Sequence, residues 1–412
     1  MDAIVERCAG LDVHKDTVVA TVRTPGTGRR RRQETATFGT TAREITRLGD
    51  WLAGFEVTLV GMEATGVYWK PVFYGLEDRF TCWLCNAFHL RNVPGRKTDV
   101  ADSVWICQLL EHGLVRPSFV PPPPIRQLRN LTRARKAQAN ERGRTVQRLD
   151  KILQDAGVKL NSVASTTLGV SSRAMLEALV AGQRDPAALA ELAKGRLRAK
   201  IPALREALDG RFDDHHATIV AQLLAHVDAL DAGIATLDAR IAEHTAPWAD
   251  LVELVCTIPG VSTRTAQVLI AECGADMSVF PTAGHLASWA GICPGNRESA
   301  GKRASGHTRP GPRWLRVALT EAAQAAARTR DTYLAAHFRV IRGRRGKAKA
   351  IGAVRHDILI AFWHIATRRE PYRDLGPDWH QRRYTPEKQA QRLVRQLERL
   401  GHTVTLQPAA TH

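Results

Sequence analysis

Four acidic residues near the start of the chain are the strongest candidates for chemistry: Asp12, Glu63, Asp99 and Asp102. Asp12 lies in an otherwise apolar segment, where a carboxylate loses hydration energy unless a cation or a metal ion lies beside it. Asp99 and Asp102 are three residues apart, a spacing that puts both side chains on one face of a helix. Converging carboxylates repel each other unless a divalent cation lies between them. The pattern therefore predicts a site for Mg²⁺ or Mn²⁺ of the kind used in phosphoryl transfer.

Each of these acids also has an ordinary structural interpretation. Asp99 fits an acid at a helix N-terminus, Asp102 its solvated neighbour, and Glu63 an exposed residue at the end of a strand. Each interpretation is reasonable for one residue alone. Because Asp12 interrupts an apolar segment, we favour a shared metal site over separate structural roles for the four acids.

The segments that carry the acids alternate between strand-like and helix-like patterns, which predicts an α/β domain with a central sheet. Two strands joined by a turn are expected between Val5 and Val22, and Arg29–Arg32 is expected to be a charged tip. Glu63 ends a strand, where α/β proteins usually place their sites. The other predicted elements are a helix at Thr41–Leu52, strands at Val57–Met62 and Phe80–Cys85, and a helix at Asp99–Glu111 capped by Thr98.

The prolines of residues 117–124 interrupt these patterns and predict a domain boundary. Beyond it, Ile125–Leu153 is expected to be a basic helix, whose cationic face suits a phosphate backbone or, equally, solvent. From Val220 to Ile241 apolar residues recur every three or four positions, as in a coiled-coil seam. The partner of this seam is either the basic helix or a second protomer. The expected regions are an α/β domain over residues 1–118, a helical and coiled-coil region over 125–248, a compact helical domain over 251–370 and a basic tail over 371–412.

Two segments of the helical domain could contact phosphates. The sequence from Thr257 to Gln267 resembles a helix-hairpin-helix motif, whose glycine-containing turn brings backbone N–H groups near a phosphate. An ordinary Pro-Gly turn between packed helices is the alternative. A basic run from Arg342 to Arg355 is expected to start as a loop at Gly343 and Gly346, and it suits either phosphate contacts or solvent.

The composition favours a polyanionic partner. The 412 residues carry a formal net charge of +18 and the pI is near 10.1, so nucleic acid is the leading partner. A membrane is not expected, because no run approaches the roughly 18 apolar residues that span a bilayer, and no signal peptide is recognisable. The 7 cysteines should be reduced, and the pair Cys82 and Cys85 lacks the second ligand pair of a zinc site. We expect a cytoplasmic protein.

Several motifs, in order along most of the chain, resemble the DEDD transposases of bacterial insertion sequences, which are bridge-RNA-guided recombinases. The first three matching segments contain the four acids. The resemblance is strongest in the C-terminal signature that contains Glu298-Ser299-Ala300-Gly301-Lys302-Arg303. The matching segments are Gly10–Lys15, Met62–Gly66, Pro94–Asp102, Ser118–Pro121, Ile258–Val261, Gly291–Pro294, Glu298–Arg303, Gly306 and Trp314–Arg316.

The resemblance implies an RNase H-like (RuvC-like) N-terminal domain, a coiled-coil insert and a mainly helical C-terminal transposase domain. It implies that Ser299 attacks DNA and that Mg²⁺ or Mn²⁺ is held by four residues, Asp12, Glu63, Asp99 and Asp102. It also implies a non-coding guide RNA, DNA of the element ends and the target, and a homodimer or tetramer at the bacterial nucleoid.

The residues around Ser299 support this role in part. Residues 295–306 are rich in glycine and charge and should form an exposed loop. No histidine is positioned in sequence to activate the hydroxyl, and Ser305 is an equal candidate by this reasoning. Activation by the metal at the acids would require two distant domains to meet. The basic residues expected to contact nucleic acid are Lys97, Arg126, Arg133, Arg135, Lys302, Arg303, Arg309, Arg313, Arg316, Arg344, Arg345 and Lys347.

The leading hypothesis is therefore a transposase or site-specific recombinase that cuts and rejoins DNA through a covalent phosphoserine. One alternative is a RuvC-like structure-specific endonuclease, in which metal-activated water attacks and Ser299 is structural. Another is a catalytically silent DNA-binding protein, which would bind DNA without metal.

Overall fold

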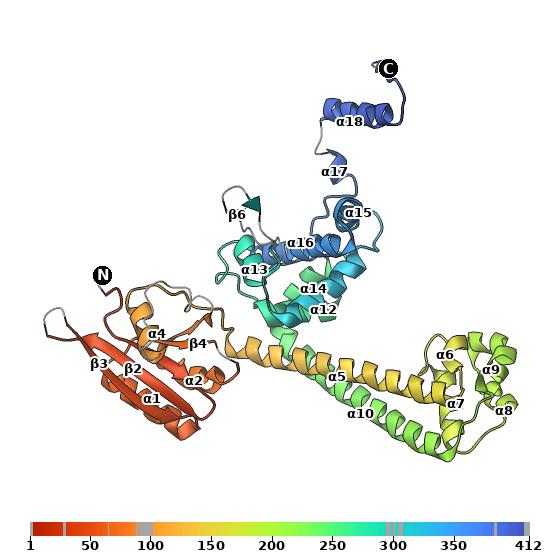
Figure 1. Ribbon diagram of the computed structural model, residues 1–412, viewed down its shortest axis with the longest axis horizontal. Coiled ribbons are helices and arrows are strands. Elements are labelled where there is room, and N and C mark those ends of the chain that lie inside the picture. Colours follow the sequence, from red (N-terminus) through yellow and green to blue (C-terminus); the bar gives the residue numbers. More distant parts are fainter. Residues whose placement is uncertain are drawn as a thin grey trace. The chain divides into compact units, whose positions relative to one another are not determined.

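The structure, a computed structural model, consists of two compact units, Met1–Val120 and Pro121–His412, which we describe separately (Figure 1). The predicted helix cap Thr98 and the candidate site residues Lys97, Asp99 and Ser305 lie outside the described part of the chain. For residues 298–299 and 302–303 only the backbone is described. The described residues are 3–27, 30–64, 66–87, 90, 102–293, 298–299, 302–303, 308–382 and 385–407.

A mixed sheet forms the centre of the first unit, and its described strands follow the order β3-β2-β1-β4-β5. The pairs β1–β2 and β2–β3 are antiparallel, whereas β1–β4 and β4–β5 are parallel. The predicted α/β architecture with a central sheet is confirmed. The strands are β1 (Cys8–Val13), β2 (Thr17–Pro25), β3 (Arg31–Gly39), β4 (Leu59–Glu63) and β5 (Thr81–Cys85).

The edge strand β3 is not predicted by the sequence. Arg31 and Arg32 were expected in a charged tip, but they pair with Pro25 and Thr24 as the first residues of this strand. Most residues of β3 are charged or polar, so the strand lacks the apolar alternation on which the prediction depends. An edge strand can carry such residues because one side of it has no neighbouring strand.

Different helices cover the two faces of the sheet. Successive residues of a strand point to opposite faces. Leu11 of β1 shares a core with residues of α1 (Ala42–Gly54) and α2 (Trp69–Leu76), whereas Cys8 packs with residues of α4 (Asp102–Glu111). The even-numbered positions of β1 therefore face α4.

Two long helices of the second unit, α5 (Pro123–Asp155) and α10 (Asp214–Thr245), pack against each other along their length (Figure 1). The predicted seam residues Val220, Val227 and Ile241 are buried. The partner of the seam is therefore the basic helix of the same chain, one of the two alternatives that the sequence leaves open.

Ion pairs show that the two helices run antiparallel. Arg135 pairs with Asp238 and Arg142 with Asp231, so residue numbers rise along one helix as they fall along the other. Asp238 also accepts hydrogen bonds from Arg264, and this guanidinium, followed by that of Arg135, lowers the pKa of the Asp238 carboxyl to about 2. The charged pairs therefore fix the register of the hairpin.

Short helices between α5 and α10 form a small core at one end of the hairpin. Leu149 and Leu153 of α5 pack there with Leu176 and Leu204. These short helices lie within the range of residues 125–248, where a helical and coiled-coil region is expected. These helices are α6 (Leu160–Val163), α7 (Val170–Val180), α8 (Pro186–Glu191), η1 (Gly195–Lys200) and α9 (Ile201–Leu208).

The remaining helices gather around α16 (Lys347–Arg368), which packs against α11, α13, α14 and α15. Gly343 lies inside α15, so the basic run that starts at Arg342 is the end of one helix and the start of the next, and the predicted loop is wrong. The described elements of this part are η2 (Ala246–Trp248), α11 (Ala249–Cys256), α12 (Thr263–Cys273), α13 (Ala283–Trp289), β6 (Glu298–Ser299), β7 (Lys302–Arg303), α14 (Arg313–Ala326), α15 (Tyr333–Arg345), α17 (Trp379–Arg382) and α18 (Pro386–Arg399).

The glycine of the predicted helix-hairpin-helix turn is required by packing. Gly260 has a φ of 83°, and a Cβ added there would lie 2.4 Å from the backbone nitrogen of Ala326 in α14. Both the left-handed conformation and the close backbone approach exclude a larger residue. An ordinary turn between packed helices therefore accounts for this glycine without a phosphate.

Among the described residues, the helical stretch Asp214–Cys256 is a candidate membrane span by length and composition, because an 18-residue window within it has a mean hydropathy of 1.3. The expectation that no such run exists is therefore too strong. A single helix of this kind is weak evidence for a membrane. Within it, Asp228, Asp231 and Asp238 pair with arginines of neighbouring helices, as expected of a helix packed within a protein.

Candidate metal centre and nucleic-acid interface

Asp12 and Glu63 occupy adjacent positions on neighbouring parallel strands. Leu11 of β1 is in register with Met62 of β4, so Asp12 and Glu63 form the next pair toward the carboxyl ends of these strands. Residues in register on parallel strands point to the same face of a sheet. The register therefore brings two of the predicted acids together on the face that α4 covers.

Two glycines allow α4 to approach this face closely. A Cβ added to Gly10 would lie 2.2 Å from the carbonyl oxygen of Ser103, and one added to Gly61 would lie 2.5 Å from a leucine side chain of α4. At Gly10 the nearest atoms belong to the backbone of α4, so only glycine permits this approach, whereas at Gly61 they belong to a flexible side chain. Ser103 lies over Gly10 of β1. Asp102, the first residue of α4, therefore lies close to β1, which carries Asp12 two residues beyond Gly10.

Polar contacts hold α4 at both ends. Near its start, the Ser103 Oγ lies 2.9 Å from the Thr21 Oγ1 of β2. At its end, the buried Glu111 accepts a hydrogen bond from Arg23 Nε at 2.6 Å and pairs with Arg31. Removing one member of such a buried ion pair leaves a charge without compensation, so the pair resists displacement. These contacts fix the position of the acid that begins the helix.

Asp12 is less buried than its sequence context suggests. Its side chain is 26% exposed, and its Oδ2 lies 3.1 Å from Nε2 of the exposed His14. The expectation of a fully desolvated carboxylate is therefore wrong, because Asp12 stands one residue from the end of its strand. The argument for a metal now depends on the convergence of acids.

The three described acids have the ligand chemistry that a hard divalent cation prefers, but among the described residues their oxygen atoms do not form a group of three within 4.8 Å of one another. Asp12 and Glu63 share one face of the sheet, and Asp102 begins the helix that covers it. Carboxylate oxygens are the ligands that Mg²⁺ and Mn²⁺ prefer. Asp99, the fourth predicted ligand, lies outside the described residues.

Ser299 belongs to the second unit and lies in a short hairpin. Its strand β6 pairs antiparallel with β7, and Ser299 is in register with Lys302. The paired strands at residues 298–299 and 302–303 lie within the range 295–306, where the sequence predicts an exposed loop. Further along, Arg309 Nη2 donates a hydrogen bond to Ser288 Oγ at 3.0 Å, and the Arg313 guanidinium lies over the neighbouring tryptophan ring.

Arg316 of α14 and Arg355 of α16 form a cationic pair that sequence reasoning missed. Arg355 Nη1 donates a hydrogen bond to Thr320 Oγ1 at 3.3 Å, and Thr320 lies one turn beyond Arg316 on the same face of α14. The Arg355 Nε is buried and has no hydrogen-bond partner within the described chain. Burial, and after it the charge of Arg316, lowers the pKa of Arg355. Two guanidinium groups placed in this way suit a phosphate.

Two of the predicted nucleic-acid contacts on α5 already have carboxylate partners. Arg133 donates to both oxygens of the buried Glu272, at 2.7 and 2.8 Å, and Arg135 pairs with Asp238. These ion pairs give both arginines a structural role between helices. Their contact with nucleic acid stays a prediction.

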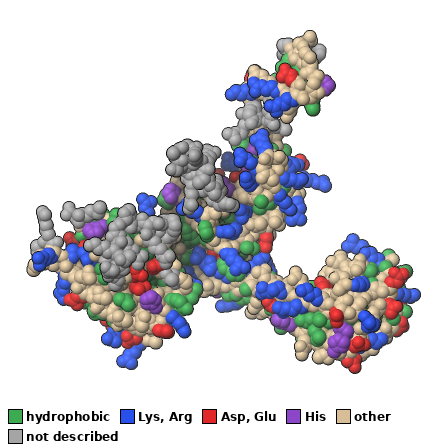
Figure 2. All heavy atoms as spheres, viewed as in Figure 1, with side chains coloured by type: hydrophobic (Ala, Val, Ile, Leu, Met, Phe, Trp, Pro, Cys, Tyr) green, Lys and Arg blue, Asp and Glu red, His purple; other side chains and the backbone are tan. Residues whose placement is uncertain are grey.

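Basic side chains are exposed where α15 meets α16. Arg344, Arg345 and Lys347 are exposed and form no ion pair with the acids that the structure describes. Figure 2 shows Lys and Arg side chains gathered over the C-terminal helices on one face of the molecule. Such a surface is typical of phosphate contacts that do not depend on sequence.

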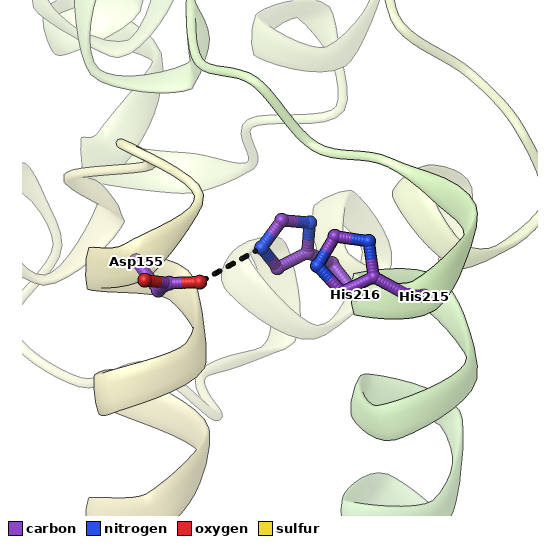
Figure 3. A group of neighbouring side chains, drawn as sticks. All are labelled: Asp155, His215 and His216. Carbon is purple, nitrogen blue, oxygen red and sulfur yellow. Dashed lines mark hydrogen bonds and ion pairs between the residues drawn. The ribbon is translucent and has the colours of Figure 1, made fainter.

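A second group with metal-ligand chemistry joins the end of α5 to the start of α10. Asp155, His215 and His216 offer ligand atoms within 4.8 Å of one another (Figure 3). However, His216 Nδ1 accepts a hydrogen bond from the Asp213 N–H at 3.1 Å, so the neutral ring carries its proton on Nε2. That proton points to Asp155 Oδ2 at 3.2 Å, which leaves His216 no lone pair for a metal. We assign this group to helix capping.

Comparisons with known proteins identify the family of the chain. Residues 9–157 match a family described as transposase, of the DEDD type of IS110 elements, and this range contains all four predicted acids. Residues 252–339 match the transposase family of IS116, IS110 and IS902 elements, and this range contains Ser299. The two matches cover more than half of the chain.

Two curated relatives are also products of insertion elements. The chain is 35% identical over 103 residues to the IS900 uncharacterized 42 kDa protein of Mycobacterium paratuberculosis. It is 41% identical over 70 residues to the IS110 uncharacterized 43.6 kDa protein of Streptomyces coelicolor. These alignments span 25% and 17% of the relatives. The chain is thus a protein of the insertion-sequence transposase class. It belongs to the IS110 family of transposases.

Proposed function

We propose that the chain is a DNA transposase that cuts and rejoins DNA to move an insertion sequence. The observation that carries the proposal is the register of Asp12 and Glu63 on the face covered by α4, in a chain of the IS110 family. The strand order, with an antiparallel first half and parallel β4 and β5, supports an RNase H-like (RuvC-like) first domain.

The acids of the first unit would hold the metal. A divalent ion bound there would supply Lewis-acid stabilisation of the charge that develops on a phosphodiester. Asp12, Glu63 and Asp102 provide carboxylates from two strands and a helix, and Asp99 completes the predicted set. We infer Mg²⁺, or Mn²⁺ in its place, because all of these ligands are oxygens.

Ser299 would perform the covalent step. Its Oγ forms a bond to phosphorus while the bond from phosphorus to one sugar oxygen breaks. The serine proton passes to that oxygen, which leaves as a sugar hydroxyl. One phosphoester bond replaces another, so a second sugar hydroxyl can attack the phosphoserine and rejoin DNA. Arg316 and Arg355 form no ion pair with a described acid, and they support this proposal because they offer positive charge to a phosphate.

The partners follow from the charge of the chain and from its family. We infer DNA of the element ends and of the target, a non-coding guide RNA, and a homodimer or tetramer in the bacterial cytoplasm. The net charge of +18 and the exposed Arg344, Arg345 and Lys347 support polyanionic partners. The finer division of the second unit into residues 125–248, 251–370 and 371–412 belongs to the same proposal.

A covalent-adduct assay tests this function. The full chain is incubated with RNA that copurifies with it, end-labelled DNA of the element ends, and Mg²⁺, and label attached to protein is measured after denaturation. The wild type should carry label, as should the control Ser278→Ala, whereas Ser299→Ala and Asp12→Asn should not. Each of these two substitutions removes a group that the covalent step needs, the nucleophile in one case and a metal ligand in the other.

Two other outcomes correspond to the alternative functions. DNA cut equally by Ser299→Ala, with no adduct, indicates a RuvC-like endonuclease in which water attacks. DNA bound without divalent metal and never cut, with the same affinity in Asp12→Asn, indicates a silent DNA-binding protein.

A further inference from the structure

A pocket of about 470 Å³ lies between α15, α16 and residues 370–375, a segment that we call the strap. Two hydrogen bonds hold the strap in place. Asp374 Oδ1 accepts from the Tyr333 N–H at 2.9 Å, and the Tyr372 N–H donates to Thr257 Oγ1 at 2.8 Å. The pocket is therefore built from fixed elements of the second unit, and the proposed DNA chemistry does not use it.

Two polar side chains that line the pocket have unsatisfied atoms. Asp357 Oδ2 and His364 Nδ1 are buried and have no hydrogen-bond partner within the described chain. The ring nitrogens of His337 and His356 lie 3.9 and 3.8 Å from the Asp357 carboxylate, too far for a hydrogen bond. Buried acceptors are almost always paired in native proteins. The pocket therefore favours a ligand that brings N–H donors to Asp357.

The other walls of the pocket suit a flat ring with an anionic group. Ile360 and Pro371 supply apolar surface, and burial raises the pKa of the Tyr372 phenol, which keeps this aromatic wall neutral. Arg368 is exposed at the rim and pairs with no described acid, whereas Arg373 pairs with an acid of the strap. A ring with N–H donors and an attached phosphate would pair with Asp357 through the ring and with Arg368 through the phosphate.

A metal ion does not fit the same pocket. Asp357 is the pocket carboxylate that lies nearest to His337 and His356. Among the described residues, it does not belong to a group of three metal-ligand atoms within 4.8 Å of one another. Stable metal sites need three or four such ligands around one point. The pocket is also much larger than an ion requires.

We propose that this pocket binds one unpaired guanine nucleotide of a single-stranded nucleic acid, either DNA or RNA. The guanine N1–H and N2–H donate to the Asp357 carboxylate, and the base lies against Tyr372 and the apolar walls. Its phosphate lies toward Arg368. The base must be unpaired, because pairing in a duplex occupies the same edge. The proposal deepens the inferred nucleic-acid function but requires neither metal nor Ser299.

Fluorescence anisotropy with short oligomers in EDTA tests the proposal. The probes are labelled heptamers with a central guanine, adenine, inosine or thymine in a thymine context, and their ribose counterparts with uracil. The wild-type chain should prefer the guanine oligomer roughly tenfold over the thymine oligomer. Inosine, which lacks the 2-amino group, should lie between them. If the preference for guanine occurs only in the deoxyribose oligomers, the natural ligand is DNA. If it occurs only in the ribose oligomers, the ligand is RNA.

Asp357→Asn should lose the guanine preference while it binds the thymine oligomer as the wild type does. The matched control is Asp331→Asn, because Asp331 is exposed and has a φ of 53°, which asparagine tolerates. If Asp357→Asn melts early, Ile360→Trp, which fills the pocket, replaces it. Equal affinity of the wild type for all oligomers, or a preference that survives both pocket variants, overturns the proposal. Ser299→Ala should keep the preference, so the two proposals fail independently.

Discussion

At the scale of single residues, the pairing of each arginine decides what it can offer to a nucleic acid. Arg142 donates to both oxygens of Asp231, at 2.5 and 3.0 Å, and this carboxylate raises its pKa. Arg316 and Arg355 have no such partner among the described acids. A guanidinium that already pairs with a carboxylate gains little binding free energy from a phosphate, because the existing ion pair must first be broken. Unpaired arginines are therefore the better candidates for phosphate contact.

The salt dependence of DNA binding tests this distinction. Arg355→Gln should reduce the slope of log Kd against log salt concentration by about 0.9, the value for one lost phosphate contact. Arg142→Gln is the matched control and should leave the slope unchanged. Both slopes come from anisotropy titrations with one duplex between 50 and 200 mM NaCl. Equal changes in the two variants would show that pairing does not select the contacts.

The sequence identified the acids but not this arginine pair. Asp12, Glu63 and Asp102 stand out because each occupies a recognisable place in a strand or helix. Arg355 appears in the sequence only as one of several basic residues. Its relation to Arg316 and Thr320 depends on how α14 packs against α16, and no local pattern records that packing.

At the scale of elements, the close approach of α4 to the sheet positions the metal site. Gly10 and Gly61 leave room for this helix, and Glu111 holds its far end through Arg23 and Arg31. The acids at the other end need this support, because a metal site depends on ligands held in a fixed geometry. The glycines thus contribute to function without touching a ligand.

Gly10→Ala should destabilise the first unit and weaken metal binding together. The new Cβ would meet the backbone oxygen of Ser103, which cannot turn aside, so the free energy of unfolding should fall by about 1–3 kcal/mol. Gly54→Ala is the control, because a Cβ there meets nothing within 4 Å. Urea denaturation measures both variants. A Gly10→Ala protein as stable as the control would mean that α4 is not packed as described.

Elements were predictable from sequence to different degrees. The strands β1, β2, β4 and β5 carry runs of apolar residues and were expected, whereas β3 is too polar to be recognised. The seam of α10 was recognised from its spacing, but its partner was not. Arg135–Asp238 and similar pairs select α5 of the same chain, and such pairs exist only once the hairpin has folded.

At the scale of the whole molecule, the candidate chemistry divides between two compact units. Residues 1–120 contain the acids, and residues 121–412 contain Ser299, the pair Arg316 and Arg355, and the strap pocket. The net charge of +18 supplies a general attraction to nucleic acid that neither site has to provide. Each site can therefore be tested separately within the full chain, the metal site without DNA and the pocket without metal.

The central claim is that the acids of the first unit bind a divalent metal. Electron paramagnetic resonance of free Mn²⁺ tests it most directly, in titrations of the full-length chain without nucleic acid. The wild type and His215→Gln should remove Mn²⁺ from solution to the same extent, because the group around Asp155 is assigned to helix capping. Asp12→Asn should lose this binding. Unchanged binding by Asp12→Asn, or its loss in His215→Gln, would contradict the account.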